Sequence, residues 1–275
     1  MTKPVQRRRL TRVTDGTSAP RHDSLATEEP LEIRVNGSQF AITMRTPGDD
    51  FDLVAGFCVS EGIAAAPEDL HAMRYCAGEQ ENTYNIIDVT VPTSGAVVAA
   101  VRERHVYTSS SCGVCGLASI DAVATTSRFD VTDNDLQVPS EVISALPDRL
   151  RDEQAIFDST GGVHAAGLFM PDGRALCVRE DVGRHNAVDK VVGWAWRENR
   201  LPLTGTVLQV SGRASFELVQ KAAMAGIPAL AAVSAPSSLA ADLAERSGIT
   251  LVGFSRGTTF NVYAHPERIT DLDPP

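Results

Sequence analysis

The sequence predicts an α/β protein whose N-terminal half is a mainly antiparallel sheet and whose C-terminal half contains parallel strands. In the C-terminal half, apolar runs at 206–210, 228–233 and 250–254 alternate with helical patterns at 214–226 and 237–248. Strands that alternate with crossover helices form a parallel sheet with right-handed connections. In the N-terminal half, the segment LEIRVNGSQFAITMRT alternates apolar and polar residues around an Asn-Gly pair, a strong signal for a two-residue hairpin turn.

Composition and charge limit the class of protein. The 275 residues include five cysteines and carry a formal charge of -10. An acidic chain of this size argues against general nucleic-acid binding, and an odd number of scattered cysteines does not resemble a secreted disulfide framework. No apolar run approaches the length of a membrane span, and no apolar segment follows Arg7, Arg8 and Arg9 as a secretory signal requires. We therefore expect a cytoplasmic protein that binds neither nucleic acid nor membranes.

The other segments complete a four-part organisation. After the hairpin we expect a helix at 50–62 and strands at 82–91 and 95–108. A helical stretch at 139–157 is expected to be interrupted at Pro147. Polar composition predicts disorder at the N-terminus. The expected parts are a disordered arm at 1–28, an α+β subdomain at 29–127 ending in a cysteine loop, a connecting segment at 128–150 and an α/β ligand-binding subdomain at 151–275.

Two cysteines, Cys112 and Cys115, stand in a run of small residues, SSSCGVCGLAS at 109–119. Thiols in such a loop are exposed and mobile, and a helix beginning just after them would favour the thiolate. Half of a zinc site is one alternative, but it needs two more ligands at close spacing, so we expect no structural metal. A thioredoxin-like dithiol is the other alternative, and it remains open. The remaining cysteines are widely scattered: Cys58, Cys76 and Cys177.

The carboxyl ends of the three C-terminal strands share small or hydroxylated residues and two arginines. Open parallel sheets bind ligands at that edge, and free amides at helix N-termini favour anions. Arginine binds phosphate in bidentate fashion. For three such ends in one sheet, we predict a phosphate-bearing ligand rather than three ordinary loops. The segments are Ser211-Gly212-Arg213, Ser234-Ala235-Pro236-Ser237 and Phe254-Ser255-Arg256-Gly257.

A polar cluster lies at a further strand-to-helix junction, EDVGRHNAVDK at 180–190. A solvated helix face accounts for single polar residues there, but it accounts less well for Glu180-Asp181 beside His185-Asn186. The sequence leaves open whether these residues contact a ligand or brace the sheet. It also leaves open whether His164 is a structural residue.

These segments together resemble the formate dehydrogenase accessory sulfurtransferase family, of FdhD/NarQ type. The resemblance runs from the first hairpin to Tyr263, and it omits the N-terminal arm. Six segments in the same order are far more specific than any one of them. They are SCGVCG, TGGVHAAGLF, EDVGRHNAVDKVVG, SGRASFELVQKAAMAGIP, AVSAPSSLA and GFSRGTTFNVY.

The resemblance implies a sulfur carrier. In such a protein, a cysteine desulfurase passes sulfur to a loop cysteine as a persulfide. The sulfur then goes to the molybdenum cofactor, Mo-bis-molybdopterin guanine dinucleotide, before the cofactor enters apo formate dehydrogenase. The persulfide cysteine matches Cys112, and Cys115 matches the second cysteine of the pair. The resemblance also implies a homodimer and a cytidine-deaminase-like fold, which is a mixed sheet with helices on both faces.

Ten residues are therefore candidates for binding the cofactor. The family's cofactor-contacting segment matches Phe254, Ser255, Arg256, Gly257, Thr258 and Thr259. The strand ends and the polar junction add Ser211, Gly212, Arg213 and His185.

Three other activities are weighed against sulfur transfer. Zinc deamination needs an H-x-E or C-x-E segment before the cysteine pair, whereas the H-A-A segment at His164 lacks the glutamate and follows the pair. A cofactor-binding chaperone that does not move sulfur would tolerate the loss of both cysteines. A dithiol oxidoreductase would form a stable Cys112–Cys115 disulfide with a measurable reduction potential.

Overall fold

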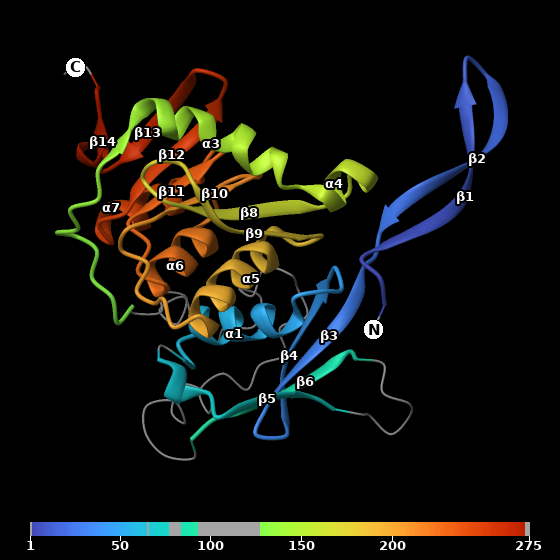
Figure 1. The fold of residues 1–275 in the computed structure, drawn as a ribbon, viewed down its shortest axis with the longest axis horizontal. Coiled ribbons are helices and arrows are strands. Elements are labelled where there is room, and N and C mark those ends of the chain that lie inside the picture. Colours follow the sequence, from blue (N-terminus) through green and yellow to red (C-terminus); the bar gives the residue numbers. More distant parts are fainter. Residues whose placement is uncertain (1, 65, 77–83, 93–126, 273–275) are drawn as a thin grey trace.

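A six-stranded mixed sheet forms the C-terminal part of the computed structural model, which describes residues 2–64, 66–76, 84–92 and 127–272 (Figure 1). The strands are β8 (His164–Phe169), β9 (Ala175–Asp181), β10 (Val207–Val210), β11 (Ala229–Ala232), β12 (Thr250–Arg256) and β13 (Thr259–Ala264). Their order is β13-β12-β11-β10-β8-β9; the central β10, β11 and β12 are parallel, and the other pairs are antiparallel. The mixed α/β class and the three predicted parallel strands are confirmed.

Helices cover both faces of this sheet. On one face lies α3 (Ser140–Asp152), whose buried side chains pack against apolar residues of β10, β11 and β12. On the other face lie α5 (Arg184–Arg197), α6 (Phe216–Met224) and α7 (Ser238–Arg246), which bury their apolar sides in a larger cluster. The short α4 (Ala155–Thr160) follows α3 at one end of the sheet (Figure 1). The cytidine-deaminase likeness stays a prediction.

Helix α3 continues through Pro147, so the predicted interruption at this residue is wrong. A proline inside a helix has no N–H to donate and leaves the carbonyl four residues earlier without its partner. Here that carbonyl belongs to Ile143, and it accepts a hydrogen bond from the Ser255 hydroxyl at 3.3 Å. A donor from a distant strand therefore satisfies the group that proline leaves unpaired, and the helix continues.

The N-terminal sheet is mainly antiparallel, as predicted. Its strands are β3 (Glu29–Val35), β4 (Ser38–Arg45), β5 (Ala72–Tyr75) and β6 (Ile86–Thr90), in the order β4-β3-β6-β5. Among these described strands, β3 and β6 pair in parallel, and the other two pairs are antiparallel. Asn36 and Gly37 both have positive φ, 50° and 81°, as the predicted two-residue hairpin turn requires. The strand predicted at 95–108 and the helix predicted after the cysteine loop lie outside the described residues.

Helix α1 (Asp50–Ser60) joins the two parts of the protein by packing across α5. The two helices cross at Gly56 and Gly193. A Cβ atom added to Gly56 would overlap the carbonyl oxygen of Asp189, and one added to Gly193 would overlap that of Asp52. The backbones are in contact, which only glycine permits. One hydrophobic cluster accordingly runs from Leu31 in the N-terminal sheet to Ala264 in the C-terminal sheet.

Residues 5–26 form an antiparallel hairpin, where the sequence composition predicts a disordered arm. The strands are β1 (Val5–Thr14) and β2 (Thr17–Ala26), paired throughout their length. Asp15 and Gly16 have φ of 49° and 78°, the conformation of a two-residue hairpin turn. At the base, the Thr27 amide donates to the Pro4 carbonyl at 2.8 Å. Asp15-Gly16 is a hairpin signal, but the flanking strands are polar rather than alternately apolar, so composition alone predicts disorder here.

Two short elements close the C-terminal end. Strands β7 (Val138–Pro139) and β14 (Ile269–Thr270) pair in parallel, and a 3₁₀ turn at Pro266–Arg268 leads into β14. A second 3₁₀ turn, Pro67–Asp69, lies in the N-terminal part between α1 and β5. The buried Arg268 side chain donates to three backbone carbonyls within 131–134, and this fastens the connecting segment to the sheet. None of the helices in the described ranges is both long and apolar enough to cross a membrane.

Candidate functional site

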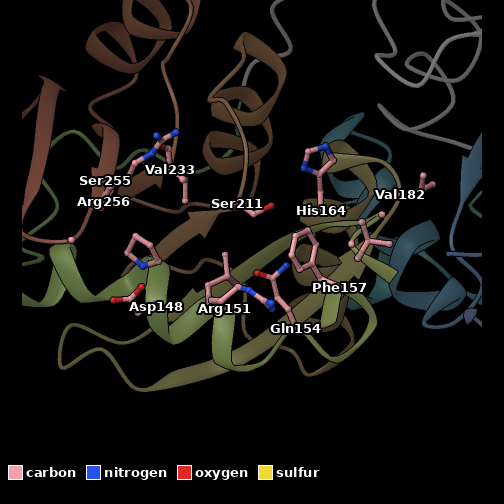
Figure 2. A pocket seen from close by; sticks show the side chains of 16 residues that line it. Asp148, Arg151, Gln154, Phe157, His164, Val182, Ser211, Val233, Ser255 and Arg256 are labelled. Carbon is pink, nitrogen blue, oxygen red and sulfur yellow. The ribbon is translucent and has the colours of Figure 1, made fainter. Parts of the chain in front are cut away.

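A cavity of about 680 Å³ lies at the carboxyl edge of the parallel strands (Figure 2). Ligands of open α/β sheets bind at this edge, and the volume is typical of a small-molecule pocket. Three groups of residues line it. The strand ends contribute Ser211, Val233, Ser255, Arg256 and Gly257. The end of α3 and α4 contribute Pro147, Asp148, Leu150, Arg151, Gln154 and Phe157. The start of β8 with the loop before it, and the turn after β9, contribute Gly161, Gly162, Val163, His164 and Val182.

The end of β12 provides an exposed cation to the cavity. Arg256 is exposed, and its Nε donates to the Val233 carbonyl at 3.1 Å. Its two terminal nitrogens have no partner among the described residues, which leaves them available to an anion. Gly257 follows with φ of 56°. Thr258, in the turn to β13, and Thr259, the first residue of β13, are exposed and lie beyond the lining of the cavity.

Phe254 is held in a strained backbone conformation. Its φ is 53°, a value that bulky residues rarely adopt, and its side chain is 43% exposed. The pairing of β12 with β13 shifts register between Gly253 and Arg256, and the Phe254 amide donates to the Ser234 carbonyl at 3.2 Å. Strain of this kind costs roughly 1–3 kcal/mol and concentrates at functional sites. Phe254 borders the segment that lines the cavity without being one of the lining residues.

Ser255 borders the cavity, but its side chain is fully buried and its hydroxyl is bonded to the Ile143 carbonyl. We predict that Ser255→Ala lowers the free energy of unfolding by about 1–3 kcal/mol, because it leaves a buried carbonyl unsatisfied. Urea denaturation of four proteins measures this: wild type, Ser255→Ala, Pro147→Ala and the double variant. In the Pro147→Ala background the helix regains its own donor, so the serine substitution should cost less. If Ser255→Ala lowers the free energy of unfolding equally in both backgrounds, the Ser255 hydroxyl does not replace the donor that Pro147 lacks.

A second basic group lies at the start of α5. Burial, followed by the nearby charge of Arg184, lowers the pKa of His164, which is half-buried in the cavity wall. The Arg184 Nε is buried and has no partner among the described residues. Gly212 lies against both side chains, because a Cβ there would be 3.6 Å from His164 Nδ1 and 3.9 Å from Arg184 Cδ. Arg213 is exposed and does not line the cavity.

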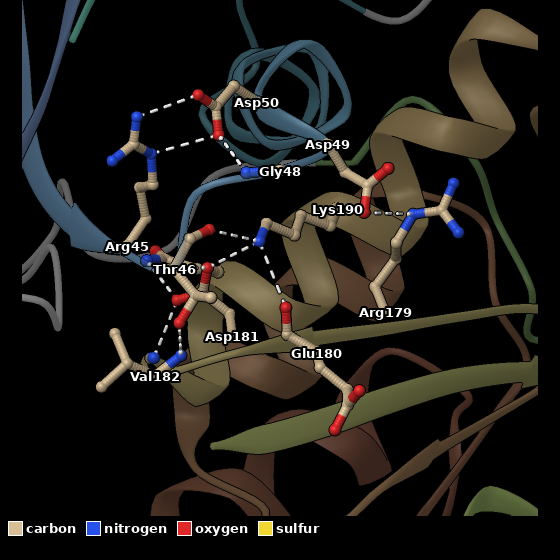
Figure 3. Close-up of polar contacts among 12 residues, drawn as sticks. Arg45, Thr46, Gly48, Asp49, Asp50, Arg179, Glu180, Asp181, Val182 and Lys190 are labelled. Carbon is tan, nitrogen blue, oxygen red and sulfur yellow. Dashed lines mark hydrogen bonds and ion pairs between the residues drawn. The ribbon is translucent and has the colours of Figure 1, made fainter. Parts of the chain in front are cut away.

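The polar junction at 180–190 makes its hydrogen bonds with the protein itself (Figure 3). The buried Asp181 carboxylate accepts from Lys190 Nζ at 2.8 Å and from the Thr46 amide at 3.0 Å, which ties β9 to the N-terminal part. The Glu180 carboxylate accepts from the amides of Ile156 and Phe157, both at 2.8 Å, and so positions α4 in the cavity wall. Asp181, Lys190 and Glu180 therefore brace the structure, which answers the question that the sequence leaves open for these residues.

His185 lies beneath the β10–α6 loop rather than in the cavity lining. It is 6% exposed, and its Nε2 lies 2.7 Å from a Glu217 carboxylate oxygen and 3.2 Å from the Ser215 hydroxyl. A ligand role for His185 stays a prediction.

Sequence reasoning missed the wall formed by α3 and α4. Arg151 lies over the Phe157 ring at 4.6 Å and pairs with Asp158 at 2.5 Å, and the buried Gln154 stands beside them. No local signal marks these residues, because they belong to a helix that the strand-end pattern does not include. These residues are far from the strand ends in the sequence, so the sequence does not indicate that they lie opposite Arg256.

Cys112 and Cys115 lie outside the described residues. Among the described cysteines, Cys58 and Cys177 are buried, and burial raises the pKa of both thiols, that of Cys177 to about 12. A thiol with a raised pKa is a poor nucleophile, because the thiolate is the reactive form. Cys76 is partly exposed.

Comparison with known proteins places these features in one family. The model of the FdhD/NarQ family matches residues 26–270. A protein of Streptomyces coelicolor named "Sulfur carrier protein FdhD" is 57% identical, over 98% of this chain and 97% of that protein. A protein of the same name from Mycobacterium tuberculosis is 53% identical, over 96% and 98%. A crystal structure of a candidate formate dehydrogenase accessory protein from Desulfotalea psychrophila superposes with a TM-score of 0.75 at 26% identity, over 96% of this chain and 99% of that one. The chain belongs to the FdhD/NarQ family.

Proposed function

We propose that this protein is a sulfur carrier that moves persulfide sulfur from a cysteine desulfurase to the molybdenum cofactor before the cofactor enters apo formate dehydrogenase. The observation that carries the proposal is the basic cavity at the strand edge of a chain that belongs to this family. The names of its relatives support sulfur carriage, and the description of the Desulfotalea protein supports the connection to formate dehydrogenase.

The cavity suits a phosphorylated ligand of nucleotide size. Arg256 and Arg151 stand on opposite walls, and the backbone of Gly161, Gly162 and Gly257 allows close approach of a ligand. Among the described residues that line the cavity, Asp148 alone carries a carboxylate. A guanine dinucleotide arm of Mo-bis-molybdopterin guanine dinucleotide offers phosphates to the arginines, and a planar base for the exposed Phe254 ring.

Two cysteines are enough to balance the atoms and electrons of the proposed sulfur transfer. The Cys112 thiolate attacks the terminal sulfur of the desulfurase persulfide; a new S–S bond forms, the old one breaks, and the donor cysteine leaves as a thiolate. Cys115 then attacks the inner sulfur of the Cys112 persulfide. Sulfide leaves and is delivered to the cofactor, and the two electrons that reduce the transferred sulfur to sulfide come from the two cysteines as they are oxidised to the Cys112–Cys115 disulfide. A thiol reductant must reopen this disulfide before the next cycle.

Identification of the bound molecule tests the ligand class. Protein purified from cells that make the molybdenum cofactor should release a guanine nucleotide or a molybdopterin derivative on denaturation, as measured by mass spectrometry. Release of an unrelated ligand, or isothermal titration in which guanosine diphosphate does not bind, would count against the proposal. A non-catalytic chaperone would bind the same molecule but dispense with both cysteines. A dithiol oxidoreductase would exchange disulfides with generic substrates and need no nucleotide.

Phe254→Gly is expected to stabilise the fold and weaken ligand binding. Glycine removes the strain of the positive φ, so the free energy of unfolding should rise by about 1 kcal/mol. Loss of the stacked ring should lower the affinity for guanosine diphosphate by about tenfold, the lower end of the effect of one base–aromatic stack. Urea denaturation and isothermal titration calorimetry measure the two effects.

Asn199→Gly, at another positive-φ position (53°) just after α5, is the matched control and should leave the affinity for guanosine diphosphate unchanged. A loss of stability in Phe254→Gly would refute the strain argument.

A further inference from the structure

Gln154 is a buried polar residue in the wall of the cavity (Figure 2). It lies between α3 and α4, and 4% of its surface is exposed. Its main chain is paired within the wall, because its amide donates to the Arg151 carbonyl at 3.2 Å and its carbonyl accepts from the Asp158 amide at 2.9 Å. Its side-chain carboxamide has no hydrogen-bond partner among the described residues. A buried polar group without a partner lowers stability, so this amide calls for an explanation.

Other hydroxyl groups in the same wall are already used by the protein. The Ser211 hydroxyl accepts from the Ala165 amide at 2.9 Å, and the Ser255 hydroxyl donates to the Ile143 carbonyl. Two polar side chains in the described lining are more than nine-tenths buried, and of these Ser255 is paired whereas Gln154 is not. The Gln154 carboxamide is therefore the buried group of this wall that is available to a ligand.

The carboxamide restricts the chemistry of the ligand that it can bind. It presents an acceptor oxygen and an NH₂ donor side by side. A ligand that displaces water from this amide keeps its affinity only if it replaces both hydrogen bonds. A cyclic amide does so, because its N–H and C=O also lie side by side. Guanine and pterin both carry this edge, since both contain a 2-amino-4-oxopyrimidine ring.

The surroundings of the amide suit a planar ring attached to a phosphate. Leu150 and Phe157, close to Gln154 in sequence, offer apolar contact in the same wall, and Arg256 lies on the opposite wall. In a molybdopterin guanine dinucleotide arm, the diphosphate lies between the pterin and the guanosine. If the phosphates bind Arg256 and the guanine stacks on the exposed Phe254, the pterin extends towards Gln154.

We propose that Gln154 recognises the cofactor through the cyclic-amide edge of its 2-amino-4-oxopyrimidine ring, which is the pterin ring when the phosphates lie at Arg256. The Gln154 oxygen accepts from the ring N–H, and its NH₂ group donates to the ring C=O. Gln154 determines specificity in this way and takes no part in sulfur transfer. The proposal rests on the proposed function, because it takes an arm of the molybdenum cofactor as the ligand.

Isothermal titration of the full-length protein with two probes tests this pairing. The probes are 6-hydroxymethylpterin diphosphate and guanosine diphosphate, which share the diphosphate and differ in the ring. Gln154→Met keeps the length of the side chain without its hydrogen bonds, and it should weaken binding of the pterin probe by about tenfold or more, as loss of a bidentate pair does. Gln154→Glu should weaken it as well, because a carboxylate sets an acceptor against the ring C=O.

The matched control is Gln39→Met, at an exposed position of β4 outside the cavity lining, and it should leave both affinities unchanged. Urea denaturation separates recognition from a structural role. The midpoint for Gln154→Met should equal or exceed that of wild type, because the amide loses no partner among the described residues. A lowered midpoint would show that the amide braces the wall, and it would overturn the proposal.

The two probes also distinguish the two rings. If Gln154→Met weakens guanosine diphosphate instead of the pterin probe, the pairing holds and the ring at Gln154 is guanine. If the variant binds as tightly as wild type every probe that wild type binds, the proposal is overturned while the proposed function stands. If wild type binds neither probe, the proposed function itself fails.

Discussion

Cys112→Ala is expected to gain no sulfur when it is incubated with a cysteine desulfurase and cysteine. Removing the attacking thiolate leaves no acceptor for the persulfide sulfur, so the rate of sulfur transfer should fall by about 10³-fold or more, as for other covalent nucleophiles. Mass spectrometry of the intact protein detects the added sulfur atom. The activity of the client formate dehydrogenase, matured with this variant as the only carrier, should fall to the level without carrier.

Two further variants make this test specific. Cys76→Ala removes the one partly exposed cysteine among the described residues, and it should take up and deliver sulfur normally. Cys115→Ala should accept sulfur but release it slowly, because no second thiol attacks the persulfide. If Cys112→Ala gains sulfur on Cys115 alone, the roles of the two cysteines are reversed. If the client stays active without either cysteine, the protein is a chaperone and not a carrier.

Gly193→Ala is expected to destabilise the protein more than any surface substitution. The new methyl group would overlap the Asp52 carbonyl oxygen, which is backbone and cannot rotate away. Helices α1 and α5 must then move apart, and we expect a loss of about 3 kcal/mol or more in the free energy of unfolding, at or beyond the upper end for overpacked cores. Gly56→Ala should act similarly through the Asp189 carbonyl. Urea denaturation followed by circular dichroism measures both effects.

Buried polar contacts around the crossing of α1 and α5 add to the expected loss of stability. Asp189 accepts hydrogen bonds from Lys221 at 2.7 Å and Ser60 at 2.7 Å, and Asp52 accepts from Arg179 at 2.9 Å. Separating the helices would strain these buried pairs, which are costly to break. Gly205→Ala is the control, because a Cβ there has no neighbour within 4 Å and the residue does not have a positive φ. It should leave the midpoint of unfolding unchanged. A Gly193→Ala protein as stable as wild type would show that the helices are not in backbone contact.

Local patterns were enough to predict the regular elements. The Asn36-Gly37 turn, the helix at 50–62 and the three parallel strands depend on short-range periodicity and turn chemistry, and all are present. Local patterns gave a wrong prediction where a residue far away in the sequence supplies a hydrogen bond. Pro147 should break a helix, but Ser255, more than a hundred residues away, supplies the missing donor. A polar hairpin in residues 5–26 gave too weak an apolar alternation to be recognised.

The candidate site was predicted in part for the same reason. Topology alone brings the ends of parallel strands together, so Ser211 and Arg256 could be assigned to one edge of the sheet from sequence. Arg151 and Phe157 could not, because they reach the cavity through the packing of α3 and α4, and Glu180 sets that packing. Order along the chain determined the strands, the family motifs and the cysteine pair. Only the tertiary structure decided which polar groups face the cavity and which are used to hold the fold together, because each buried donor or acceptor takes its partner from space rather than from sequence.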